Sequence, residues 1–128
     1  MPAKKVISNL KKHGEFEQIL KRIDEGDAHW IALVPNLYNG TDAGDSEDIE
    51  IALATALPKN ASAVLSILNG DEAAAEGQPR IDRVCGVPFI EPTDNFVKKY
   101  LKESTAALKA VSDEKLLPVA NQCLGYLK

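Results

Sequence analysis

The chain has 128 residues, a length typical of one domain with its own hydrophobic core. Hydrophobic residues make up 45% of it and charged residues 27%, a balance that excludes general disorder. The formal net charge is −4 and lysines are mixed among acidic residues, so nucleic acid is not an expected partner. No apolar run approaches the roughly 20 residues that cross a bilayer, so we expect no membrane span.

The first part of the chain shows helical periodicity. Apolar residues recur at helical spacing over residues 6–23, with an interruption near Gly14, and predict one helix or two. Asp27 is a suitable cap for a second helix over residues 28–38. Pro35 should kink that helix or break its last turn, because the proline ring removes a backbone donor.

A loop over residues 39–45 separates this part from the next helices. Asp45 or Ser46 is the expected cap of a third helix, which Pro58 prevents from continuing. Asn60 is the expected cap of a short fourth helix that stops at an Asn-Gly pair.

The longest irregular stretch covers residues 71–92. Loops of this length in a compact domain are usually functional or covalently fastened. After it, Thr93 or Asp94 caps the clearest helix of the chain. A last helix is expected over residues 113–127, with Pro118 tolerated only in its first turn. The inward face expected for the helix after Thr93 comprises Phe96, Val97, Tyr100, Leu101, Ala107, Leu108 and Val111.

These elements predict an all-α fold. Alanine and leucine are abundant and β-branched runs are scarce, which favours helices over strands. We expect a single helical domain over residues 1–128 with five or six helices. They should form an irregular bundle or a short stack of antiparallel helical pairs.

The two cysteines, Cys85 and Cys123, are compatible with one disulfide. Cys123 falls on the apolar face of the last helix, and Cys85 lies in the irregular stretch, so a bridge would fasten that stretch to the core. A bridge of this span stabilises a fold by roughly 4 kcal/mol in the chain-entropy model. The alternative is two buried free thiols, as in cytosolic cores.

The acidic segment over residues 39–50 is the first candidate site. Its carboxylates have the chemistry that hard cations such as Ca²⁺ prefer, but their spacing matches a calcium loop poorly. A structural role at a helix amino terminus explains the same acids. No catalytic motif, nucleotide loop or zinc spacing is present, so we expect no catalytic residues, no cofactor and no metal.

Three phrases resemble a group of small uncharacterised exported proteins of proteobacteria. They are GTDAG at residues 40–44, ALPKN at residues 56–60 and CGVPFIEP at residues 85–92. The resemblance extends from residue 30 to about residue 123. It implies a periplasmic protein with an amino-terminal signal, presumed removed here, and a pair of cysteines like Cys85 and Cys123. It implies no reaction and no catalytic residue.

The sequence therefore leads to a non-enzymatic hypothesis. We expect a periplasmic domain that binds another envelope protein, for example as an inhibitor or immunity-type factor, through residues 39–47 and 71–92. The alternative is a small-ligand or cation-binding module that uses the acidic segment, and a third hypothesis is a hydrolase that uses the acids around the same loop. The candidate binding residues are Trp30, Thr41, Asp42, Asp45, Phe89 and Ile90.

Overall fold

The computed structural model describes residues 3–38, 41, 43–68 and 79–127, and all regular elements in these ranges are helices. The helices are α1 (Ala3–Lys12), α2 (Glu15–Asp24), α3 (Ala28–Ala32), α4 (Val34–Tyr38), α5 (Ala43–Ala56), α6 (Ala61–Ile67), α7 (Ile81–Val84), α8 (Asp94–Lys109) and α9 (Leu117–Tyr126). The prediction of an all-α fold is confirmed. The predicted number of five or six helices is wrong, because the described ranges hold nine.

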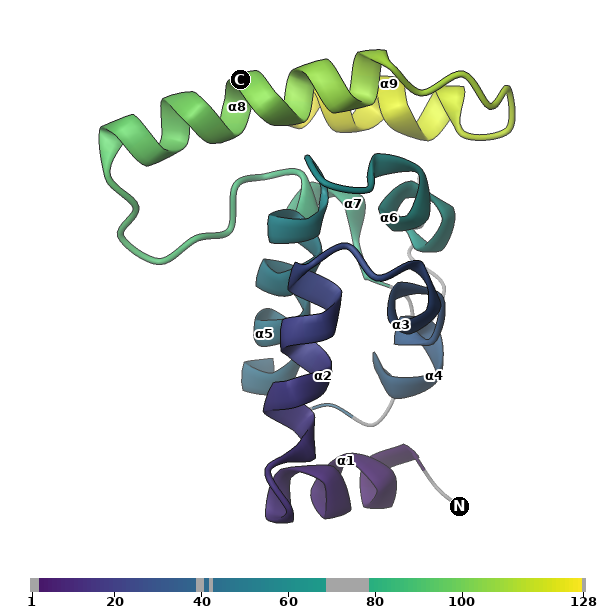
Figure 1. The fold of residues 1–128 in the computed structure, drawn as a ribbon, viewed down its shortest axis with the longest axis vertical. Coiled ribbons are helices and arrows are strands. Elements are labelled where there is room, and N and C mark those ends of the chain that lie inside the picture. The colour runs from purple at the N-terminus through teal and green to yellow at the C-terminus, as the bar shows by residue number, and fades with distance from the viewer. Residues whose placement is uncertain (1–2, 39–40, 42, 69–78, 128) are drawn as a thin grey trace.

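The helices form a stem and a crossbar (Figure 1). In the stem, α2 packs along α5, while α3 contacts α4 and α6. Helix α1 crosses the foot of the stem and contacts α2 and α4. Helices α8 and α9 lie side by side across the opposite end, and α6 and α7 connect them to the stem.

Two breaks and one short helix explain the larger number of helices. Gly14 adopts a positive φ of 72° and separates α1 from α2. The predicted helix over residues 28–38 divides at Leu33, whose N–H bonds to the Trp30 carbonyl in a tighter turn just before Pro35. Helix α7 lies inside the stretch that was predicted to be irregular.

The helix caps follow local chemistry. The side chains of Asp27, Asn60 and Thr93 each accept a hydrogen bond from a backbone N–H in the first turn of the helix that follows. These three predicted caps are confirmed. The prediction that Asp45 or Ser46 caps the third helix is wrong, because α5 already begins at Ala43.

The last helix is shorter than predicted. Helix α9 spans Leu117–Tyr126 and carries Pro118 in its first turn, where proline costs no helical hydrogen bond. The preceding residues form a turn in which the Asp113 side chain accepts a hydrogen bond from the Lys115 N–H.

The core is one cluster of buried apolar side chains drawn from all the described helices. The predicted disulfide is confirmed: Cys85, at the end of α7, is bonded to Cys123 of α9, and both residues are fully buried. This bridge attaches the crossbar to the stem. Within the described ranges, no helix is both long and apolar enough to cross a membrane.

Candidate binding site: an aromatic groove beneath the crossbar

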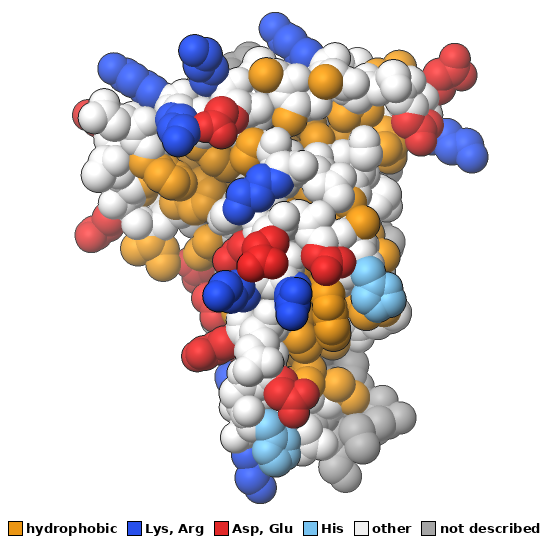
Figure 2. Space-filling model, viewed as in Figure 1, with side chains coloured by type: hydrophobic (Ala, Val, Ile, Leu, Met, Phe, Trp, Pro, Cys, Tyr) orange, Lys and Arg blue, Asp and Glu red, His pale blue; other side chains and the backbone are white. Residues whose placement is uncertain are grey.

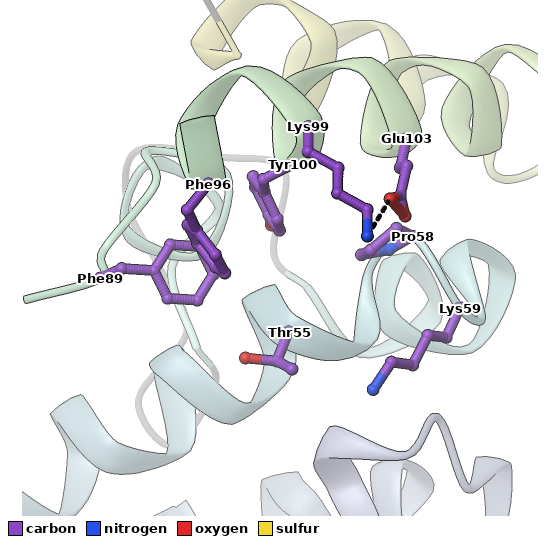
Figure 3. Close-up of a pocket in the computed structure, with 8 residues that line it drawn as sticks. All are labelled: Thr55, Pro58, Lys59, Phe89, Phe96, Lys99, Tyr100 and Glu103. Carbon is purple, nitrogen blue, oxygen red and sulfur yellow. Dashed lines mark ion pairs between the residues drawn. The ribbon is translucent and has the colours of Figure 1, made fainter. Parts of the chain in front are cut away.

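A groove opens where the end of α5 meets α8 (Figure 3). We call it the aromatic groove. Its walls come from three segments: the last turns of α5 with the turn that follows, the loop before α8, and one face of α8 itself. Its lining residues are Thr55, Pro58, Lys59, Phe89, Phe96, Lys99, Tyr100 and Glu103.

Three aromatic rings form one end of the groove. The Phe89 ring meets the Phe96 ring edge-on at 5.0 Å between centroids and the Tyr100 ring at 4.8 Å. The Phe96 and Tyr100 rings, one helical turn apart, are nearly parallel at 6.2 Å. These are favourable arrangements for aromatic pairs, so the rings form a stable apolar wall.

Tyr100 anchors this wall to the stem. Its hydroxyl donates a hydrogen bond of 2.6 Å to the backbone carbonyl of Ala54, and only 6% of the residue is exposed. Burial raises the pKa of the Tyr100 hydroxyl to about 12, because the charged phenolate would lose its solvation. Tyr100 therefore stays a neutral donor throughout the physiological range.

The loop before α8 presents its apolar side chains under backbone strain. Val87 and Glu91 adopt positive φ values of 55° and 46°, conformations that are unfavourable for residues with a Cβ, especially a β-branched one. Between them lie Phe89, which lines the groove, and Ile90, which is 73% exposed. Strained backbone of this kind is often found at binding sites.

Part of the exposed apolar surface lies here. Phe96 is 45% exposed, so its predicted inward position is wrong. In the space-filling view, hydrophobic side chains gather beneath the crossbar, with lysines beside them (Figure 2). A solvent-exposed apolar patch around a hollow is a common mark of an interaction site.

Side chains of the acidic segment make hydrogen bonds and ion pairs with other residues of the chain. The Asp45 carboxylate lies 3.1 Å from the Lys11 ammonium and is largely buried. The Thr41 hydroxyl bonds to the Ser46 hydroxyl and to the Tyr38 carbonyl. Asp42 lies outside the described residues.

Glu50 lies deeper on α5 and joins three helices. Its carboxylate accepts a hydrogen bond from the Tyr38 hydroxyl of α4 and lies 3.8 Å from the Arg83 guanidinium of α7. Burial raises the pKa of Glu50, and the Arg83 charge only partly offsets this effect. Burial also raises the pKa of Tyr38, with the Glu50 charge adding to the shift. In the described part of the chain, no group of three or more His, Cys, Asp or Glu side chains could hold a metal ion.

The predicted binding residues do not form one site. Asp45 lies in the first turn of α5, ten residues before the groove residue Thr55, or about 15 Å along the helix. Trp30, on α3, lines another hollow together with Leu10 of α1 and Arg22 of α2. Of the six candidates, only Phe89 lines the aromatic groove, and Ile90 is its exposed neighbour in the sequence.

Most groove residues were not among the sequence-based candidates. Phe96 and Tyr100 look like ordinary core positions because they follow the helical period of α8. Thr55 and Pro58 lie at the end of another helix, about forty residues earlier in the chain. The useful signal was the presence of Phe89, Phe96 and Tyr100, three of the few aromatic residues, within twelve positions.

Comparison with known proteins found no matching family model, curated protein or solved structure.

Proposed function

We propose that this protein is a non-enzymatic domain that binds another protein, and that the aromatic groove receives one apolar side chain of that partner. The observation that carries the proposal is the exposure of Phe96 in the lining of a preformed hollow, with Ile90 exposed in the loop that supplies Phe89. Apolar anchors that enter small preformed pockets dominate the binding energy of many protein interfaces. An inhibitor or immunity-type role is one form of this function.

The size of the groove favours a side chain over a small-molecule ligand. Its volume is about 210 Å³. Typical ligand pockets measure about 300–1,000 Å³, whereas an engineered cavity of about 150 Å³ accommodates benzene. One leucine or phenylalanine side chain therefore fits the groove.

An irregular helical bundle over the whole chain is the proposed scaffold. Support comes from the single apolar cluster and from the contacts of α2 with α5 and of α8 with α9. Regularly stacked pairs are less consistent with the crossbar, which lies across the stem.

The proposed compartment is the periplasm, and the proposed partner is another envelope protein. Support comes from the disulfide, because such bonds persist mainly in oxidising compartments. The measurement is a count of free thiols in denatured, unreduced protein purified from its native host. No free thiol is the expected result, and two free thiols would contradict the periplasmic proposal.

The groove itself is tested with a model of one partner side chain, N-acetyl-phenylalaninamide. In an NMR titration of the protein, we expect the largest shift changes at the aromatic residues of the groove. Thr55→Trp should abolish them because the indole fills the space. Thr105→Trp is the matched control, since Thr105 is also half-buried but does not line the groove. Unchanged groove resonances up to the solubility limit of the probe would contradict the proposal.

Photo-crosslinking then tests whether the natural occupant is a protein. A photoreactive phenylalanine analogue is placed at Phe96 or, as a control, at Tyr126, because these aromatic residues are 45% and 43% exposed. Only the first position should give a discrete protein adduct in the native host, and Thr55→Trp should remove it. Equal adducts from both positions would show that the groove has no special role.

A further inference from the structure

The aromatic groove has two chemically different ends. Figure 3 shows the three aromatic rings grouped on one side and Lys59, Lys99 and Glu103 on the other with Pro58, while Thr55 lies between the two groups. An occupant with one apolar side chain at the aromatic end would therefore place its neighbouring groups beside the charged end.

Lys99 can bind a partner with little loss of stability of the fold. Its side chain is 80% exposed, and its ammonium lies 3.8 Å from the Glu103 carboxylate, longer than a charge-assisted hydrogen bond. Exposed ion pairs of this kind contribute little to stability. A carboxylate from a partner can replace Glu103 without a large loss.

Lys59 lines the same end, but its ammonium is directed toward the end of α2 and away from Lys99 (Figure 3). Its ammonium donates a hydrogen bond of 2.9 Å to the backbone carbonyl of Asp24, which holds the group in place and leaves it further donors. Lys59 also interacts with the Asp24 carboxyl group.

The adjoining surface of α8 is basic as well. Lys98 and Lys102 are exposed beside Lys99, and Glu103 is the one acid among residues 98–103. This stretch is positive although the whole chain carries a net charge of −4. A local field of this sign favours acidic segments of a partner.

We propose that the occupant of the aromatic groove is a protein segment in which a carboxylate lies next to the apolar anchor, and that Lys99 binds this carboxylate. This inference rests on the proposed protein-binding function and specifies its partner. The carboxylate is either an acidic side chain or the carboxyl terminus of the partner chain.

The test compares two probes with the same anchor, N-acetyl-phenylalanine and N-acetyl-phenylalaninamide, which differ by one negative charge. At low salt we expect the carboxylate probe to bind about fivefold more tightly by NMR titration, the gain of one charge pair about 4 Å apart near water. This preference should disappear with Lys99→Gln and at about 1 M salt. Lys109→Gln, an exposed lysine outside the groove, should leave it unchanged.

The outcomes separate this inference from the function on which it rests. Equal affinity for the two probes would overturn the carboxylate proposal and leave the apolar docking site intact. Absence of binding by either probe would overturn both. Sedimentation equilibrium supplies a further outcome, because a dimer that dissociates with Thr55→Trp would assign the groove to a second copy of this chain.

The two sources of the carboxylate are distinguished with two peptides. One ends in phenylalanine with a free carboxyl terminus, and the other carries an internal Phe-Asp pair with an amidated end. The peptide that retains the dependence on Lys99 identifies the source. If neither peptide depends on Lys99, the proposal is wrong.

Discussion

The Tyr100 hydroxyl is the polar end of an otherwise apolar contact between α8 and α5. Pro58 has no N–H, so the Ala54 carbonyl lacks its usual helical donor four residues later. The Leu57 N–H reaches that carbonyl at 3.3 Å, and the Tyr100 hydroxyl supplies the shorter bond, at 2.6 Å. Pro58 thus leaves the Ala54 carbonyl without its usual helical donor, and Tyr100, distant in the sequence, supplies a hydrogen bond in its place.

Replacing Tyr100 should therefore weaken the fold. We expect Tyr100→Phe to lower the free energy of unfolding by about 1–2 kcal/mol, because the buried carbonyl loses its better donor. Urea denaturation measures the change, and Tyr126→Phe on α9, where the tyrosine is 43% exposed, is the control. A loss of equal size in both variants would contradict the specific role of the Tyr100 hydroxyl.

Glu91 shows a different residue-scale effect, because its backbone is strained while its side chain is exposed. The left-handed region raises the conformational energy of a residue with a Cβ by about 1–2 kcal/mol, whereas glycine has no such cost. We expect Glu91→Gly to raise the free energy of unfolding by about 1 kcal/mol after the entropic cost of glycine. Glu91→Ala, which keeps the Cβ, should give no such gain in the same urea denaturation experiment. Destabilisation by Glu91→Gly would show that the strain is absent in solution.

At the scale of elements, Glu50 couples α4, α5 and α7 through its contacts with Tyr38 and Arg83. Its raised pKa means that folding favours the protonated carboxyl group. This contribution to stability is fully present below the ordinary pKa of 4.5 and is lost as the pH rises through the higher pKa of the folded state. Neutral pH is thus unfavourable for this side chain.

Glutamine is a neutral isostere of glutamate, so Glu50→Gln should remove the pH dependence that Glu50 gives to the stability of the fold. Relative to the wild type, Glu50→Gln should be more stable at pH 7 than at pH 4, because the variant avoids a buried charge only where Glu50 is ionised. Urea denaturation at the two pH values gives the comparison, with Glu114→Gln, an exposed acid in the turn between α8 and α9, as the control. A variant that loses more stability at pH 7 than at pH 4 would show that the Arg83 contact outweighs burial.

Sequence patterns predicted the elements better than their assembly. Asp27, Asn60 and Thr93 were predictable as caps because a cap depends on residues within one turn. The short helix α7 was missed because four residues are too few to show a periodic pattern. Periodicity also placed Phe96 in the core, although this residue lines the open groove and is 45% exposed.

The aromatic groove was not predictable because it arises from contacts between distant segments. Phe89 indicated a functional loop, but Thr55 and Lys59 carry no local signal that they face α8. The acidic segment gave a stronger sequence signal, and the structure explains its buried acids by internal partners, Lys11 for Asp45 and Tyr38 with Arg83 for Glu50. Clusters of charged residues were thus a weaker guide to the candidate site than the grouping of scarce aromatic residues.

At the scale of the whole molecule, the disulfide connects the stem to the crossbar. Cys85 and Cys123 are 38 residues apart in sequence, and the segment between them includes the Phe89 loop and all of α8. The bridge therefore closes the part of the chain that supplies all three rings of the aromatic wall. We therefore expect both the stability of the fold and the geometry of the groove to depend on the disulfide.

Removal of the bridge tests this dependence. Closing a loop of this length contributes about 4 kcal/mol in the chain-entropy model, so Cys85→Ala with Cys123→Ala should lower the free energy of unfolding by about that amount. Hydrogen exchange should accelerate most in α7, α8 and α9, and N-acetyl-phenylalaninamide should bind more weakly. Reduced wild-type protein is the control and should behave like the double variant. A uniform acceleration over all helices with unchanged probe binding would show that the bridge stabilises the fold without shaping the groove.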